Sequence, residues 1–419
     1  MGQRRTQRHV ESGAGWAETR PRLLDTRLAR PRAILAAVEP THQALNQLGP
    51  PWSVADSLAE LARLADTGDI QVVRTISQRL PEAHPRTYFG EGKAHELATW
   101  LEAEACDIAV FDDELSPSQQ KGVEAIIGAG KAVDRTQLIL DIFASRAHTR
   151  EGALQVELAR AKYQIPRLRR LWTHLERQRG GTGTRGGAGE TQLETDRRAL
   201  QKTAKRLEQE LDVVRARRSE QRKARHQKWP TVALVGYTNA GKSTLLNALT
   251  GASVGARDQL FATLDPTTRK WALGAEGAVL LTDTVGFIHK LPATLVAAFR
   301  ATLEEAIEAD LLLHVIDASS KHAPGQATVV LDELEQIGAG APVVTVLNKI
   351  DLIPAAERRE ALANLRGTFP DAVAVSATCK EGLAGLADRV RASLASPAPT
   401  WPSRAPTDAP ADSPSGAHP

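Results

Sequence analysis

Residues Thr231 to Thr244 read TVALVGYTNAGKST: an apolar run, a loop framed by two glycines, then a lysine and a serine. Val232 to Val235 is typical of a short buried strand, and leucines follow Thr244 at helical spacing. A G-x-x-x-x-G-K-[ST] pattern between a strand and a helix predicts a phosphate-binding loop, because backbone N–H groups and the helix N-terminus both favour anions. The loop positions expected to bind a nucleotide are Gly236, Tyr237, Thr238, Asn239, Ala240, Gly241, Lys242, Ser243 and Thr244.

The length and composition of the chain set outer limits. Its 419 residues leave room for two or three domains. The apolar runs, such as Leu311 to Ile316, are much shorter than the roughly 18 to 20 residues of a membrane span, so we expect none. Two cysteines, Cys106 and Cys379, are too few for a disulfide framework or a metal cluster and favour the cytoplasm.

Alternating apolar and helical patterns divide the chain into five expected regions. Residues 1–32 carry eight basic and three acidic residues, which favours a disordered basic arm over a transit peptide. Residues 33–148 predict a small α/β domain with a parallel sheet, 149–228 an antiparallel helical hairpin, 229–395 the nucleotide domain, and 396–419 a proline-rich disordered tail. In the first domain, Gly90 to Lys93 (GEGK) resembles half a phosphate loop, but a glycine turn into a helix is the simpler interpretation.

The predicted hairpin has the seam of a coiled coil. Apolar residues alternate at spacings of four and three, and Pro166 inside the first seam predicts a kink. The seams comprise Leu154, Leu158, Ala161, Ile165, Leu168, Trp172 and Leu175, then Leu193, Leu200, Ala204, Leu207, Leu211 and Val214. From Asp196 to Lys228 there are twelve Lys and Arg against five Asp and Glu, which fits either a solvated face or a polyanion partner.

The expected tip of the hairpin is Gly180 to Gly189 (GGTGTRGGAG), with six glycines in ten positions. We reject its formal G-x-G-x-x-G as a dinucleotide site, because no strand precedes it. Two interpretations stay open, a flexible linker and a mobile loop that approaches a phosphate backbone closely. In the second, the candidate RNA contacts are Arg177, Arg179, Gly183, Arg185 and Gly186.

Three further motifs each follow a predicted strand. Asp283-Thr284-Val285-Gly286 is expected to hold Mg²⁺ through water and to contact the γ-phosphate. Asn348-Lys349-Ile350-Asp351 provides a carboxylate, that of Asp351, to accept from guanine N1–H and the guanine amino group, a donor pair that adenine lacks. Ser376-Ala377-Thr378 is placed to touch the base. This order predicts an α/β P-loop GTPase domain of the translation-factor class, with a mostly parallel sheet, rather than a P-loop kinase.

The metal site needs Ser243 and a residue from the loop between Phe261 and Thr267. Thr263 is expected to join Mg²⁺ when a triphosphate is bound, with Thr267 as the alternative. Lys242 is expected to reach the β- and γ-phosphates. The residues assigned to catalysis are Lys242, Asn239, Thr263 and Gly286.

Phe287 follows Gly286 at the position where many GTPases place a water-orienting glutamine, and its side chain cannot serve that role. One hypothesis is K⁺ bound beside the phosphates with help from Asn239. The rival is a group supplied by a partner. His289 is interpreted as a loop or switch residue rather than a base.

Several of these segments together resemble the HflX family of ribosome-associated GTPases. The resemblance rests on Phe111 to Ser116 (FDDELS), Gly186 to Arg198 (GGAGETQLETDRR), Phe261 to Thr267 and Asp283 to Phe287. It implies a cytoplasmic GTPase that binds the large ribosomal subunit, splits or rescues stalled ribosomes under stress, and places the 180–189 loop near the peptidyl transferase centre. It also implies that the first domain of some members binds ATP. A folded domain that longer members carry after the nucleotide domain is not expected here.

Two functional hypotheses therefore remain. In the first, the protein is a monomeric GTPase in which GTP, with Mg²⁺, orders the Thr263 and Asp283 loops while the hairpin engages ribosomal RNA. In the second, it is a GTP-gated scaffold or anti-association factor whose slow hydrolysis is incidental. Phe287 is compatible with either.

Overall fold

The computed structural model describes residues 30–41, 52–170, 188–226, 228–252, 259–274, 277–292, 295 and 303–395. These residues fall into two compact units, one within Met1–His42 and Val54–Ser145, the other within Gln43–Ser53 and Arg146–Pro419. The predicted N-terminal arm and C-terminal tail lie outside the described residues, apart from Arg30 to Arg32. No helix in the described ranges is long and apolar enough to cross a membrane.

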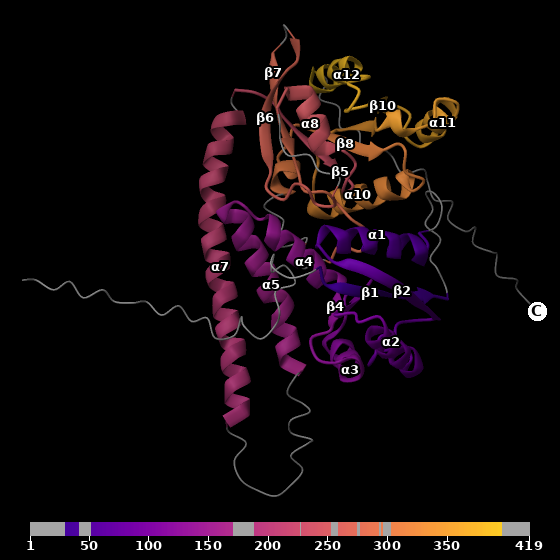
Figure 1. The fold of residues 1–419 in the computed structure, drawn as a ribbon. Coiled ribbons are helices and arrows are strands. Elements are labelled where there is room, and N and C mark those ends of the chain that lie inside the picture. Colours follow the sequence, from indigo (N-terminus) through magenta and orange to yellow (C-terminus); the bar gives the residue numbers. More distant parts are fainter. Residues whose placement is uncertain are drawn as a thin grey trace, which may run out of the picture. The chain divides into compact units, whose positions relative to one another are not determined.

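The first unit is built on a four-stranded parallel sheet in the order β2-β1-β3-β4 (Figure 1). Its elements are β1 (Arg32–Pro40), α1 (Val54–Thr67), β2 (Gln71–Leu80), α2 (Glu91–Ala103), β3 (Ile108–Phe111), α3 (Pro117–Ile127), β4 (Ala132–Asp134) and α4 (Arg135–Arg146). The parallel sheet agrees with the alternation in the sequence, whereas β4 and α4 were not predicted. Leu97 of α2 and Val123 of α3 belong to the cluster that buries Ile34 and Phe111 on one face of the sheet.

The GEGK segment of this unit is a helix start. The N–H of Gly90 donates to Gln78 Oε1 at 2.9 Å, and α2 begins at the next residue. Lys93 pairs with Glu96, one turn further along the helix, at 2.8 Å. These contacts support the simpler of the two sequence interpretations, a glycine turn into a helix.

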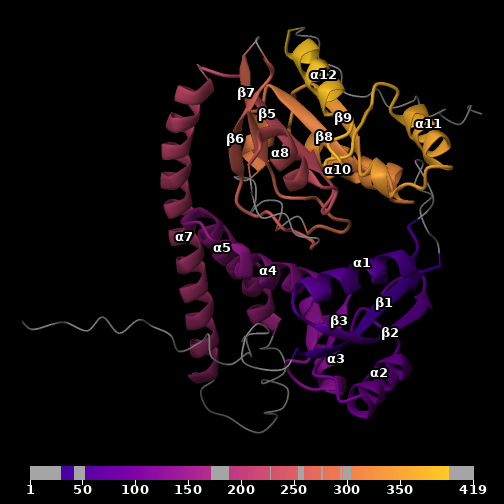
Figure 2. The ribbon, with the colours of Figure 1, turned by 45° about the horizontal axis from the view of Figure 1, so that its top comes forward.

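The second unit contains a six-stranded sheet in the order β10-β9-β8-β5-β7-β6, parallel except for the antiparallel pairing of β6 with β7. Its elements are β5 (Thr231–Gly236), α8 (Lys242–Thr250), β6 (Thr267–Ala272), β7 (Ala278–Asp283), β8 (Leu311–Asp317), α10 (Ala323–Ile337), β9 (Val343–Asn348), the 3₁₀ turn η3 (Ile350–Leu352), α11 (Arg358–Thr368), β10 (Val373–Ala374) and α12 (Leu383–Ala395). Helices cover both faces of the sheet (Figure 2). Leu246 of α8 and Val390 of α12 pack on one face, while Ala327 of α10 and Leu365 of α11 pack on the other.

The second unit also contains two long helices, α5 (Arg150–Arg170) and α7 (Ala188–His226), which precede the strands of this sheet in the sequence. The two helices lie side by side (Figure 1, Figure 2). Their shared core consists of Leu154, Leu158, Ala161, Leu200, Ala204, Leu207 and Leu211. The helices run antiparallel, because Arg218 pairs with Glu151 near the start of α5 and Glu208 pairs with Lys162 further along it.

The helical bounds refine the expected hairpin. Helix α5 continues past Pro166 to Arg170. Helix α7 begins at Ala188, so Ala188 and Gly189, which the sequence assigned to the glycine-rich tip, are already helical. The other tip positions and the candidate RNA contacts Arg177, Arg179, Gly183, Arg185 and Gly186 lie outside the described residues.

Candidate functional site

The loop between β5 and α8 is shaped by two glycines with positive φ. Gly236 ends β5 at φ 152°, and a Cβ there would lie 2.3 Å from the carbonyl oxygen of Val315 on the neighbouring strand. Gly241 has φ 91° as the N-cap of α8, and a Cβ there would lie 2.4 Å from Asn348 Nδ2. Both positions therefore require glycine, and the loop between them leads directly into the N-terminus of α8.

Lys242 is buried at the first position of α8. Its Nζ donates to the carbonyl oxygens of Gly236 at 3.1 Å and Tyr237 at 3.0 Å, both in the loop itself. Burial lowers the pKa of Lys242 to about 8, against the opposing effect of the negative charge of Asp283. An anion bound in the loop would favour the charged form of the Lys242 amine. It would also compete with the two carbonyl oxygens for the N–H groups of that amine.

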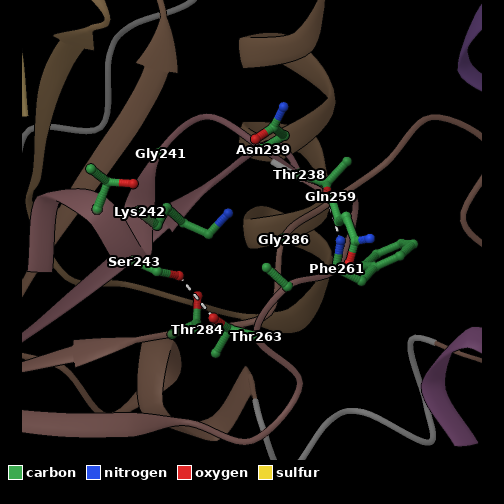
Figure 3. Close-up of a pocket in the computed structure, with 12 residues that line it drawn as sticks. Thr238, Asn239, Gly241, Lys242, Ser243, Gln259, Phe261, Thr263, Thr284 and Gly286 are labelled. Carbon is green, nitrogen blue, oxygen red and sulfur yellow. Dashed lines mark hydrogen bonds between the residues drawn. The ribbon is translucent and has the colours of Figure 1, made fainter. Parts of the chain in front are cut away.

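Three side-chain oxygens from three segments meet beside Lys242. Ser243 Oγ lies 2.6 Å from Asp283 Oδ2, Thr263 Oγ1 lies 2.8 Å from the same Oδ2, and the two hydroxyl oxygens are 2.8 Å apart. Figure 3 shows the Ser243–Thr263 contact at the edge of the pocket. Thr267, the alternative predicted from the sequence, begins β6 and lies opposite Asp283 in the antiparallel pairing. The hydroxyl that contacts both Ser243 and Asp283 is that of Thr263.

This oxygen cluster fits a hard divalent cation. Asp283 is fully buried, and within the described part of the chain its Oδ1 has no hydrogen-bond partner. Burial raises the pKa of Asp283, an effect opposed by the charge of Lys242. One carboxylate and two hydroxyls suit Mg²⁺, which is usually held by few protein oxygens together with water and phosphate. A cation would also satisfy the orphaned Oδ1.

The segment after Asp283 pairs with the phosphate loop through its backbone. The N–H of Phe287 donates to the carbonyl oxygen of Gly236 at 3.1 Å, and Thr238 N–H donates to the carbonyl oxygen of Phe287 at 2.6 Å. A Cβ at Gly286 would lie 2.7 Å from Thr238 Cα, so the two segments approach closely. The Phe287 ring is buried and cannot orient a water molecule. Thr284 lines the pocket, but its hydroxyl donates to the carbonyl oxygen of Leu234 at 2.6 Å.

The motifs expected to read guanine meet through Asn348 at the end of β9. Its Nδ2 donates to the carbonyl oxygen of Ala240 in the phosphate loop at 3.0 Å, and its Oδ1 accepts from Ala377 N–H at 3.1 Å. Lys349 has φ 63° and pairs with Asp317 at 2.7 Å. Asp351 lies in η3, which begins at the residue after Lys349. Asn348 thereby joins the two segments expected to recognise guanine, residues 348–351 and 376–378, to the phosphate loop at one edge of the sheet.

The pocket also includes residues that the sequence analysis did not assign to the site individually. Gln259 and Phe261 line it together with the predicted Thr238, Asn239 and Thr263 (Figure 3). Ala262 lines it as well. Phe261 has φ 55°, rare for an aromatic residue, and its N–H donates to Thr238 Oγ1 at 2.9 Å. No local pattern could have indicated this contact, because it joins residues 23 positions apart. His289 contributes its backbone N–H to the Tyr237 hydroxyl at 2.7 Å, in keeping with a loop residue.

A glycine-framed loop between a strand and a helix, on a sheet with Asp283 and Asn348 at the ends of strands β7 and β9, defines a P-loop GTPase. Three family models match consecutive segments: "GTP-binding GTPase N-terminal" at residues 55–144, "GTP-binding GTPase Middle Region" at 146–225 and "50S ribosome-binding GTPase" at 231–349. The chain is 48% identical to a GTPase HflX of Magnetococcus marinus over 88% of this chain and 83% of the relative. It is 47% identical to a GTPase HflX of Escherichia coli over 73% and 71%. The chain belongs to the HflX family of GTPases.

Solved structures include a GTP-binding protein from the archaeon Sulfolobus solfataricus in complex with GDP. It is 23% identical, with a TM-score of 0.44, over 87% of this chain and 99% of that one. The family membership rests on the sequence matches. It identifies the protein as an enzyme that binds and hydrolyses GTP.

Proposed function

We propose that the pocket binds the phosphates of GTP through residues 236–244 and holds Mg²⁺ with Ser243, Thr263 and, through water, Asp283. The observation that carries this proposal is the three-oxygen cluster beside Lys242, in which Asp283 Oδ1 is buried without a hydrogen-bond partner among the described residues. Mg²⁺ there would neutralise charge on the β- and γ-phosphates. Lys242 would leave the carbonyl oxygens of Gly236 and Tyr237 to reach the same phosphates.

The same proposal assigns roles to the other residues of the site. The Gly286 N–H would contact the γ-phosphate, next to Thr284 and Val285, and Thr263 would report its presence. Asn348, Lys349 and Asp351, with Ser376, Ala377 and Thr378, would recognise guanine, with Asp351 as the base-selecting carboxylate. Replacing Asp351 with Asn should lower GTP and GDP affinity while raising affinity for xanthosine nucleotides, whose C2 carbonyl replaces the amino donor. An unchanged guanine preference in this variant would overturn the assignment.

The contribution to hydrolysis that Phe287 cannot supply is assigned to a K⁺ bound beside the phosphates. Asn239, with φ 61°, lies in the phosphate loop and lines the pocket, where its side chain would help to hold the ion. Single-turnover hydrolysis in K⁺ and in Na⁺ at equal ionic strength tests this. Equal rates would rule out the K⁺ assignment and would favour a catalytic group supplied by a partner.

We further propose that the protein associates with the large ribosomal subunit in its GTP state and splits or rescues stalled ribosomes under stress in the cytoplasm. The support is membership of the HflX family, the family model for 50S ribosome-binding GTPases matched at residues 231–349, and the excess of basic residues along α7. In this proposal the protein acts as a monomer of three folded domains, 33–148, 149–228 and 229–395. Helices α5 and α7 form a coiled-coil arm whose 180–189 tip contacts ribosomal RNA.

Sucrose-gradient cosedimentation with separated ribosomal subunits tests the partner. Comigration with the large subunit is expected with a non-hydrolysable GTP analogue and reduced comigration with GDP. Absence of binding in both states would leave a GTPase with a different target. A GTP-gated scaffold with incidental hydrolysis is the second candidate, because Phe287 removes the usual water-orienting side chain. Turnover that large subunits do not stimulate would favour the scaffold.

A further inference from the structure

The loop that carries Thr263 is attached to the start of helix α5 by the carboxylate of Asp265. Asp265 Oδ2 accepts from the backbone N–H groups of His148 at 3.1 Å and Thr149 at 3.0 Å, and Oδ1 accepts from the Thr149 hydroxyl. Asp265 and its three donor groups all lie in the second unit of the fold. These contacts join segments 116 to 117 residues apart in the chain.

Thr149 is itself the residue that caps α5. Its Oγ1 accepts from Gly152 N–H and its carbonyl oxygen accepts from Ala153 N–H, both at 3.0 Å. The Asp265 carboxylate therefore lies at the positive end of α5, where a negative charge stabilises the helix. A Cβ at Gly152 would come within 2.5 Å of Asp265 Oδ1. The absence of a side chain at position 152 is what permits this close approach.

A second contact holds the same loop to the same segment. The Arg146 guanidinium donates to the carbonyl oxygen of Phe261 at 3.2 Å and to Gln259 Oε1 at 2.7 Å. Arg146 thus fixes the loop before Thr263, and Asp265 fixes it two residues after. Thr263 lies between these attachments, with its hydroxyl at the oxygen cluster.

We propose that Asp265 is a positioning residue for Thr263 and that it links the magnesium site to helix α5. With Asp265 bound to the start of α5, the Thr263 hydroxyl stays beside Ser243 and Asp283, where Mg²⁺ and the triphosphate need it. Linkage makes this coupling reciprocal: a triphosphate that holds Thr263 also stabilises the first turn of α5, and displacement of α5 weakens Mg²⁺ binding in the triphosphate state. Because α5 packs along α7, the start of the helical pair responds to the bound nucleotide. This inference rests on the proposed role of Thr263.

The first test measures the Mg²⁺ concentration that half-saturates binding of a fluorescent non-hydrolysable GTP analogue and of fluorescent GDP by the full chain. In Asp265→Ala we expect this concentration to rise about five- to tenfold with the GTP analogue. With GDP it should stay within about twofold of the wild type, because Thr263 is needed only when the γ-phosphate is present. Equal shifts with both nucleotides, or no shift with either, would show that Asp265 does not position Thr263 and only stabilises the start of α5.

Two pairs of variants control for folding. Thr149→Ser keeps the hydroxyl and should behave as the wild type, whereas Thr149→Val should reproduce the selective shift of Asp265→Ala. Asp310→Ala is the matched control, because Asp310 accepts from the N–H of Thr231 at 2.7 Å and from its hydroxyl at 3.1 Å, at the opposite end of β5 from the phosphate loop. It should leave the nucleotide selectivity of the Mg²⁺ requirement unchanged. A selective shift in Asp310→Ala would show that the loss of any such carboxylate contact has this effect.

Thr263→Ala separates the two proposals. If Thr263→Ala leaves the Mg²⁺ requirement with the GTP analogue unchanged, the role of Thr263 fails and the inference fails with it. If Thr263→Ala raises that requirement and Asp265→Ala does not, only the positioning role of Asp265 fails.

Hydrogen exchange gives a readout that does not depend on activity. The amides of His148 and Thr149 should exchange more slowly with the GTP analogue and Mg²⁺ than with GDP and Mg²⁺. Asp265→Ala should abolish this difference. Equal exchange in the two nucleotide states of the wild-type protein would overturn the link between the magnesium site and α5.

Discussion

Asn348 Nδ2 lies 3.0 Å from the carbonyl oxygen of Ala240, so the end of β9 holds the phosphate loop directly. The other end of the same amide, Oδ1, accepts from the N–H of Ala377. Asn348 is buried, and both of its partners are backbone groups of segments expected to bind the nucleotide. Its side chain therefore connects the phosphate loop to the segment expected to contact the guanine base.

Replacing Asn348 with Ala should weaken GTP and GDP binding together. The change leaves the Ala240 carbonyl and the Ala377 N–H unpaired, at a cost of about 1–3 kcal/mol for each buried group. We expect about a tenfold to hundredfold loss of affinity for both nucleotides, measured with fluorescent analogues, and a lower melting temperature. Asn364→Ala, at an exposed position of α11, is the control and should change neither. A loss of affinity for GTP but not for GDP would contradict this connecting role of Asn348.

Nucleotide affinity should fall as pH rises above about 8. In the nucleotide-free protein burial lowers the pKa of Lys242 to about 8, and a bound phosphate raises it again by favouring the ammonium. Below the pKa of the nucleotide-free protein, the Lys242 amine is charged with and without bound nucleotide, so the affinity does not change with pH. Above it, binding must take up a proton, so affinity should drop by up to about tenfold per pH unit.

Calorimetry of GDP binding in buffers with different ionisation enthalpies would measure that proton uptake directly. Uptake should approach one proton per GDP as the pH rises past the pKa of the nucleotide-free amine. Lys242→Arg, which stays charged throughout, should bind GDP without this uptake. Equal uptake in the wild type and in Lys242→Arg would assign the proton to another group.

The parts of the site that could be predicted are those where a motif directly follows an apolar run. Asp283 ends β7 and Asn348 ends β9, and carboxyl ends of parallel strands share one edge of the sheet, so local sequence was enough to place both residues at that edge. The sequence also favoured Thr263 over Thr267 for the proposed Mg²⁺ site, and the Thr263 hydroxyl contacts Ser243 and Asp283. It assigned Thr284 to the nucleotide without indicating that its hydroxyl bonds to Leu234.

Other parts carried no local signal. Strand β6 is a short edge strand in which only Trp271 is buried, so its pattern does not stand out from a polar loop. The contact of Asp265 with Thr149 joins an acidic loop residue to a distant helix cap, and each residue alone is ordinary. Nothing in the sequence indicated that Asn348 would bond to backbone groups rather than to a ligand, because the amide suits both.

His314 should make the protein sensitive to acid. It is buried on β8, and burial, with a further contribution from the charge of Lys242, lowers its pKa to about 3. The unfolded chain protonates this imidazole near its ordinary pKa of about 6.5, whereas the folded chain does not. The free energy of unfolding should therefore decrease as pH falls from about 6.5 towards 3, by up to about 1.4 kcal/mol per pH unit from this group.

Urea unfolding of the nucleotide-free protein at pH 5 and pH 7 would measure this effect as a difference between variants. His314→Leu should lose less stability between the two pH values than the wild type. His95→Leu, at an exposed position of α2, should keep the wild-type dependence. If His314→Leu is as acid-sensitive as the wild type, the imidazole is not a source of the effect.

Phe287→Gln should not restore fast hydrolysis. The ring of Phe287 is buried while its backbone N–H pairs with Gly236 and its carbonyl with Thr238, so a glutamine at this position would bury its amide where the ring now lies. Burying that amide without partners should cost about 1–3 kcal/mol, seen as a lower melting temperature. Phe287→Leu keeps an apolar side chain and should retain the wild-type single-turnover rate with a smaller loss of stability. A rate in Phe287→Gln about tenfold above the wild type would mean that the backbone rearranges to bring position 287 to the γ-phosphate, and that Phe287 restrains hydrolysis.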